Sequence, residues 1–182
     1  MAESVVLARA VLVDAFSRVA EMLPMGLTGL TPEQMLWRPD EGSNSIGWLA
    51  WHLTRVQDDH LAGVGGVDQV WLTEGWADRF GLPYPATSIG YGQTADDIAA
   101  FDVTAADLLL GYFAATQTMT LAVLESMSAA DFERVVDDRW DPPVTASVRI
   151  VSVVNDITQH LGQIGYLRGL VERHSPEATI KP

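Results

Sequence analysis

Residues 156–163 read DITQHLGQ and place Asp156 and His160 four positions apart inside an apolar periodic stretch. In an α-helix these two positions lie on one face, about one turn apart. The apolar period on either side predicts that this face packs into a protein core. Because an acid beside an imidazole is costly to bury without a partner, the stretch predicts a core helix that carries a polar site.

Working outward from this helix, the apolar pattern predicts an all-α fold with four long helices in one domain, residues 1–182. Pro24 and Gly26 are expected to end the first helix, and Thr104 with Asp107 is expected to cap the third. One long crossover connection between the second and third helices suits a four-helix bundle that is not simply up-down-up-down. The predicted helices span residues 4–23, 43 or 45 to 65, 104–126 and 147–173.

The connection at residues 67–103 is long and rich in aromatic residues, among them Trp71 and Trp76. Long loops in compact domains tend to be functional or to contain small elements of their own. We therefore expect this segment to wrap one end of the bundle and cover a cavity. Its GYGQT run (residues 90–94) is expected to be a turn, since no strand precedes it and no third glycine follows.

The charge and the cysteine content of the chain limit which binding partners are expected. The net charge of −13 repels phosphate backbones and anionic lipid, so nucleic acid and membrane surfaces are not expected as partners. The chain has no cysteine, so any thiol chemistry needs a thiol from outside. Without a signal peptide pattern at the N-terminus, the expected location is cytoplasmic. A homodimer is also considered, with Met22, Met25 and Met35 either on its contact surface or in the core.

The second helix supplies a partner for the acid and histidine, His52, in the sequence WLAWHL (residues 48–53). Two imidazoles and one carboxylate that converge between helices would suit a divalent metal with open coordination positions. His60 lies about 12 Å further along the helix axis and on another side, so it is not expected to share a small ion with His52. Asp59 shares the face of His52 but lies about 10 Å away, which suits contact with a substrate.

The same residues have simpler interpretations. An Asp–His hydrogen bond between packed helices would explain Asp156 and His160 without a metal, and core tryptophans are common. A carboxylate general base that acts without a metal is a further alternative. Gln163 falls one turn beyond His160 on the same face, from which it would touch a bound substrate or water.

The chain resembles the DinB-like (YfiT-like) superfamily, which includes mycothiol-dependent maleylpyruvate isomerase and related thiol S-transferases. The resemblance rests on GWLAWHL (residues 47–53) in the second helix, and on HLGQ (residues 160–163) followed by YLRG (residues 166–169) in the fourth. It implies a divalent metal ion held by one histidine of the second helix and an H-x-x-x-H pair of the fourth. His52 matches the first position and His160 the last, whereas Asp156 stands where a histidine is common.

The resemblance implies a metal-dependent enzyme that acts on a small molecule, of the low-molecular-weight-thiol S-transferase type. His52, Asp156 and His160 would hold zinc or nickel, with manganese and iron as alternatives. Asp59 and Gln163 would serve as catalytic residues on the substrate side, beside Trp71 and Trp76. The co-substrate would be a thiol such as mycothiol or bacillithiol. The alternative function is a non-catalytic bundle that binds a small ligand or only dimerises.

Overall fold

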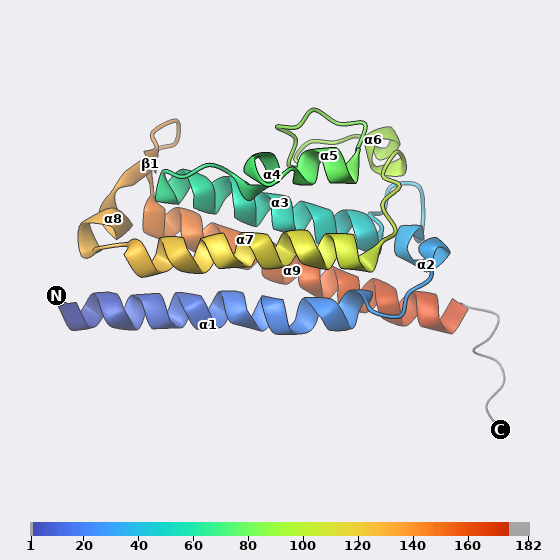
Figure 1. Ribbon diagram of the computed structural model, residues 1–182, viewed down its shortest axis with the longest axis horizontal. Helices are drawn as coiled ribbons and strands as arrows, with labels where there is room; N and C mark the ends of the chain where they lie inside the picture. The colour runs from blue at the N-terminus through green and yellow to red at the C-terminus, as the bar shows by residue number, and fades with distance from the viewer. Residues whose placement is uncertain (1, 175–182) are drawn as a thin grey trace, which may run out of the picture.

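The computed structural model describes residues 2–174 of the 182-residue chain, and four long helices dominate it (Figure 1). Helix α3 packs against α7 and α9, and α1 packs against the same two helices, so that α1 and α3 lie on opposite sides of the bundle. The prediction of an all-α fold is confirmed. The long helices are α1 (Ala2–Leu27), α3 (Ile46–Gly65), α7 (Ala106–Ser126) and α9 (Ala146–His174).

Local sequence signals set both ends of α3. The Ser45 hydroxyl accepts a hydrogen bond from the Trp48 amide, which satisfies one of the free amides at the start of a helix. At the other end Gly66 adopts a left-handed backbone with a φ of 64°, as helix C-caps often do. These caps match the predicted bounds, and they place His52 two turns into the helix.

The predicted end of α1 is wrong, because the helix runs through Pro24 to Leu27. Leu23 and Leu27 are both fully buried, so continuing the helix adds apolar burial that offsets the hydrogen bond lost at proline. Gly26 packs so closely on α9 that an added Cβ would lie 2.6 Å from the Ile164 side chain. Packing between helices thus overrides a local stop signal.

The predicted capping box of the third long helix is also wrong. Helix α7 begins at Ala106 after Ala105, which has no side-chain oxygen to cap it. The buried side chains of Phe101 and Val103 anchor the chain just before the helix. This anchoring, and not the capping signal, sets where the helix begins.

Short elements close the other connections. Helix α2 (Pro32–Leu36) follows a capping box of Thr31 and Gln34, and α8 (Ala129–Glu133) follows a box of Ser128 and Asp131. Strands β1 (Val135–Asp137) and β2 (Val144–Thr145) form a small antiparallel hairpin just before α9.

The aromatic connection between α3 and α7 forms three short helices, α4 (Val70–Thr73), α5 (Trp76–Phe80) and α6 (Ala95–Ala99). Helix α4 contacts both α3 and α7, so this part of the segment lies along the side of the bundle (Figure 1). Trp71 and Trp76 are buried, whereas Tyr91 is 92% exposed. The segment covers a cavity, as expected, but it does so along the flank of α3.

Helix α7 is the one helix among residues 2–174 that is long and apolar enough to cross a membrane. Its buried residues include polar side chains, Thr116 and Thr120, that face the bundle. A core helix of a bundle meets the same length and composition criteria as a membrane span, and α7 packs against both α1 and α3.

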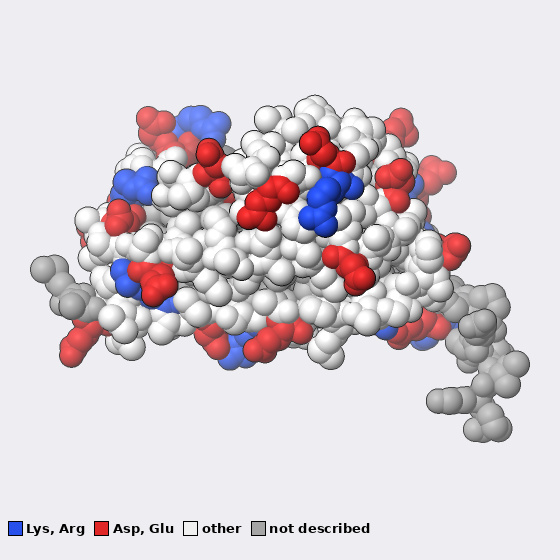
Figure 2. All heavy atoms as spheres, in the orientation of Figure 1, with Lys and Arg blue, Asp and Glu red and all other residues white. Residues whose placement is uncertain are grey.

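On the face in view, acidic side chains are scattered, and Arg side chains stand among them without forming a broad patch (Figure 2). Met22 and Met25 are 54% and 70% exposed on α1, whereas Met35 is fully buried. Met35 therefore belongs to the core, and only Met22 and Met25 remain available for a contact surface.

Candidate metal centre

His52 lies on the side of α3 that faces α9, and its ring is held on two sides. Trp48, one turn earlier, stacks on the imidazole with ring centroids 4.7 Å apart and planes 19° from parallel. The Nδ1 atom donates a hydrogen bond to the carbonyl oxygen of Ile89 in the connection before α7. Since Nδ1 carries the proton, the lone pair of the neutral ring is on Nε2.

His160 on α9 is oriented in the same way. Its Nδ1 donates to Oε1 of Gln163 at 2.8 Å, so its lone pair is also on Nε2. That Nε2 atom faces the Asp156 carboxylate one turn earlier, with Oδ2 3.7 Å away. The separation is too long for a hydrogen bond, so Asp156 and His160 do not fill each other's hydrogen-bonding capacity.

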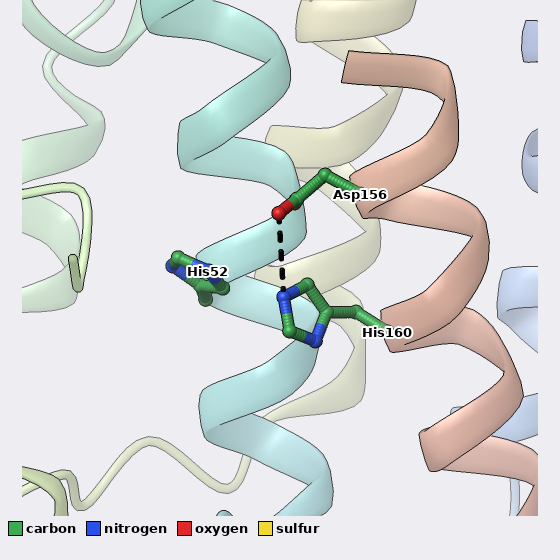
Figure 3. Close-up of side chains that lie close together, drawn as sticks. All are labelled: His52, Asp156 and His160. Carbon is green, nitrogen blue, oxygen red and sulfur yellow. Dashed lines mark ion pairs between the residues drawn. The ribbon is translucent and has the colours of Figure 1, made fainter. Parts of the chain in front are cut away.

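The three side chains converge between α3 and α9 (Figure 3). One ligand atom from each of His52, Asp156 and His160 can be chosen so that all lie within 4.8 Å of one another. The two imidazole rings are 4.8 Å apart between centroids and nearly perpendicular. The helices thus bring together residues that lie more than 100 positions apart in the sequence.

This donor set fits a divalent cation. Asp156 Oδ1 is buried and has no hydrogen-bond partner within residues 2–174, a costly arrangement unless something else pairs with it. With both imidazoles neutral, the set carries a single negative charge and each ring offers an Nε2 lone pair to an ion. Ligands of one tetrahedral zinc lie about 3.4 Å apart, so small side-chain rotations would bring these donors into range.

Electrostatics differ between the two histidines. Burial lowers the pKa of His52, which favours the neutral ring that binds metals. Burial also opposes the charge on His160, but the Asp156 carboxylate and Gln163 outweigh it and raise the pKa of that ring. For Asp156, burial raises the pKa, but the imidazoles of His160, His52 and His60 together outweigh it, so the net shift is downward and the carboxylate stays ionised.

Gly90 permits the hydrogen bond to His52. Its φ of 91° is in the left-handed region, and a Cβ at this position would lie 2.6 Å from His52 Nδ1. The loop carbonyl of Ile89 can reach the imidazole only because no side chain stands there. The sequence predicted only a turn for this segment. The close spacing of Gly90 and Gly92 indicated a tight loop, but no local sequence signal indicated that this loop contacts His52.

The other predicted site residues lie around the three ligands. Gln163 contacts His160 itself, so it orients the ring of a candidate ligand. Asp59 lines a cleft of about 480 Å³ further along α3, where it accepts a hydrogen bond from Gln69 and lies 3.3 Å from His60. His60 also lines the cleft, and the charge of Asp156 acts on its pKa, although burial dominates and lowers it.

Trp71 and Trp76 do not lie at the three ligands. Trp71 packs under the connection, where it contacts Trp51 and Tyr112, and Trp76 packs on Tyr112. Both tryptophans belong to the core beneath α4 and α5. The interpretation of these rings as packing residues is therefore the one that matches the structure.

A second buried polar cluster on α3 was not predicted. Arg55 and Asp58 form an ion pair at 3.4 Å, and both side chains are fully buried. Asp58 also accepts hydrogen bonds from the Tyr112 hydroxyl and from the backbone amides of Val70 and Trp71. The guanidinium of Arg55 bonds Ser88 and Gln69 in the connection. An Arg-x-x-Asp pair inside an apolar helix was the signal that indicated it.

Comparisons with known proteins agree with this architecture. The profile of the DinB superfamily matches residues 15–164. The crystal structure of a conserved protein from Enterococcus faecalis superimposes with a TM-score of 0.83 at 30% identity, over 89% of this chain and 95% of that one. No functionally curated protein matches the sequence. The chain belongs to the DinB superfamily.

Proposed function

We propose that this protein binds one divalent metal ion through His52 Nε2, His160 Nε2 and the Asp156 carboxylate, and that it is a metal-dependent enzyme acting on a small molecule. The observation that carries the proposal is the convergence of three donors whose lone pairs are free. Each histidine donates its Nδ1 proton to an oxygen, and one buried Asp156 oxygen has no partner among the described residues. Such outer hydrogen bonds orient ligands in metal sites.

Three protein ligands favour a catalytic site over a structural one. Structural zinc sites are closed by four protein ligands, whereas catalytic sites keep a position open for water or substrate. Imidazole with carboxylate suits zinc or nickel, and also manganese or iron. A bound ion would lower the pKa of a water or thiol placed at its open position.

The cleft further along α3 is the proposed substrate side. Its lining includes Asp59 and His60 but none of the three proposed ligands, and the charge of Asp156 reaches the His60 ring. Asp59 would contact the substrate there, since its carboxylate is about one third exposed. Gln163 would act on the opposite side of the site by holding His160.

We further propose that the nucleophile is a low-molecular-weight thiol, which would make the protein an S-transferase. The chain has no cysteine of its own, so the thiol would be a second substrate. This part of the proposal rests on the family resemblance and on the open coordination position. A screen of small thiols with an electrophile, run with and without chelator, tests it independently of metal binding.

The metal site itself is tested by elemental analysis of protein purified without an affinity tag. We expect about one equivalent of metal in the wild type and none in His52→Ala or His160→Ala, with helical content unchanged by circular dichroism. His60→Ala is the matched control, because it removes an imidazole from the same helix and should leave the metal content intact. Less than about a tenth of an equivalent in every wild-type preparation would contradict the proposal.

A further inference from the structure

Helix α1 forms one edge of the molecule, and its outer side carries a row of exposed side chains (Figure 1). The inner side packs against α7 and α9, and it buries Phe16, Val19 and Leu23. On the outer side, four large apolar side chains are between 54% and 70% exposed. Between them stand Asp14 and Arg18, which form an exposed ion pair at 2.7 Å. We call this row the outer stripe, and it consists of Leu7, Val11, Asp14, Arg18, Met22 and Met25.

The spacing of the outer stripe is that of a helix packing face. Successive members are three or four residues apart, so they follow one side of α1 over about 27 Å. Exposed apolar residues that are scattered singly need no explanation, whereas a continuous row of them marks a contact surface. Helix α1 therefore has a second apolar side, opposite the one that it buries in the bundle.

The outer stripe has the same pattern in both directions from residue 16. Leu7 and Met25 are each nine positions from this centre, and Asp14 and Arg18 are each two positions from it. Two α1 helices that packed side by side in opposite directions, crossing at residue 16, would bring each end of one stripe onto the other end of the second. The stripe is thus complementary to itself, as a two-fold interface requires.

Charge selects the antiparallel direction. In that arrangement Asp14 of one copy faces Arg18 of the second copy, and the contact occurs twice across the two-fold axis. A parallel pair would instead place Asp14 beside Asp14 and Arg18 beside Arg18, and like charges at facing positions repel. The ion pair that each copy makes within its own helix would extend into a network of four charges.

We propose that the outer stripe is the surface through which two copies of this chain form an antiparallel dimer. Leu7 of one copy would pack on Met25 of the second copy, and Val11 would pack beside Met22. Methionine suits such a contact because its flexible side chain fills irregular gaps. This inference goes beyond the proposed metal-dependent activity, since it uses none of the metal-binding residues.

The charge of the whole chain also favours this surface for contact between copies. At a net charge of −13, two copies repel each other over most of their surface. The outer stripe holds one acid and one base, so it carries no net charge of its own. A contact of one helix per copy is at or below the lower end of specific interfaces, about 1,200 Å² in total. We therefore expect a dimer that dissociates at micromolar concentrations.

Sedimentation velocity over a range of protein concentrations tests whether this dimer forms. Val11→Glu is expected to weaken it at least about tenfold, because the new carboxylate would lie near Glu21 of the second copy. Val151→Glu is the matched control, since this valine of α9 is 61% exposed, against 68% for Val11, and lies outside the stripe. It adds the same charge and should leave the dissociation constant unchanged.

The charge pairing is tested by exchanging the two charged residues. Asp14→Arg and Arg18→Asp each place like charges opposite one another, so each variant alone should be mostly monomeric where the wild type is dimeric. An equal mixture of the two restores opposite charges and should form a mixed dimer. Both side chains are exposed, so helical content by circular dichroism should not change.

The direction of the helices is read by disulfide formation, because the chain has no cysteine of its own. A mixture of Leu7→Cys and Met25→Cys should form a disulfide between the two variants under mild oxidation, since these positions would lie opposite each other. Leu7→Cys alone should form far less, because the two copies of residue 7 would be about 27 Å apart. Intact mass spectrometry distinguishes the mixed species.

Several outcomes would overturn the inference. A wild type that stays monomeric up to about 1 mM has no such interface, and binding of that monomer to neutral lipid vesicles through Val11 would assign the stripe to a lipid surface. A dimer that persists in Val11→Glu, or that Val151→Glu weakens equally, uses another surface. Faster disulfide formation between two copies of residue 7 than between residues 7 and 25 would mean that the helices are parallel.

Discussion

Helix α3 carries two polar clusters within two turns of each other, and they differ in how completely their hydrogen bonds are made. Arg55 and Asp58 are fully buried, and Asp58 is met by the guanidinium, one hydroxyl and two backbone amides. Around His52 the side chains remain partly exposed, and one oxygen of Asp156 has no partner within residues 2–174. The hydrogen bonding of the Arg55–Asp58 cluster is complete, whereas the His52 cluster retains atoms that could bind a metal ion.

The difference separates a structural role from a binding role. A buried ion pair is tolerated only when further hydrogen bonds compensate for lost hydration. The Arg55–Asp58 cluster meets that condition with groups from the connection, so it ties residues 69–88 to the bundle. In the His52 cluster, the hydrogen bonds made by the Nδ1 atoms orient the two rings. The candidate ligand atoms, Nε2 of each ring and Oδ1 of Asp156, make none among the described residues. Completeness of hydrogen bonding therefore distinguishes the two clusters better than residue type does.

The largest effect is expected from breaking the complete cluster. Asp58→Ala would leave the Arg55 charge buried without its carboxylate, at a cost of about 3–5 kcal/mol in the free energy of unfolding. Urea denaturation followed by circular dichroism measures this. Asp59→Ala is the control, since its carboxylate is partly exposed and should contribute less than about 1 kcal/mol. Similar stabilities for the two variants would remove the distinction between the clusters.

An intermediate effect is expected from filling the incomplete cluster. A metal ion at 100 times its dissociation constant stabilises the folded state by about 2.7 kcal/mol, which for a chain of this size raises Tm by roughly 5–11 °C. Thermal melts of metal-free protein with added zinc or nickel measure the shift. His160→Ala should show no shift, because it removes one ligand.

If the His160→Ala variant were stabilised as much as the wild type, the ion would be binding elsewhere. Metal-free His160→Ala should also melt close to the metal-free wild type, since the imidazole is not part of a completed hydrogen-bond cluster.

The smallest effect is expected from loosening a ring without removing a ligand. Gln163→Leu would delete the acceptor of His160 Nδ1 and is expected to weaken metal binding about 10- to 100-fold. Competition with a chromophoric chelator measures the affinity. Gln159→Leu is the control, because this exposed glutamine bonds only the Asn155 carbonyl of its own helix. Equal affinities of both variants would mean that Gln163 does not orient the ligand.

Much of the fold was predictable because it follows from local rules. Apolar period and caps indicated the four long helices, with α3 bounded by Ser45 and Gly66 as expected. The errors arose at Pro24 and Thr104, where tertiary burial of neighbouring residues outweighed a local signal. The sequence of one segment does not show whether tertiary burial outweighs a local helix signal, because the outcome depends on which other residues pack against that segment.

The sequence by itself determined which side chains share a helical face: Asp156 with His160 on one helix, and His52 on another. Helical geometry alone places these residues, because residues four apart lie one turn apart. Only the tertiary structure decided that the Ile89 carbonyl holds His52, and that the side chains of Arg55 and Asp58 are paired with each other and with their neighbours. The contact of His52 depends on a loop carbonyl 37 residues away, and the pairing of Arg55 and Asp58 depends on groups 12 to 57 residues away. Local preferences do not encode such contacts.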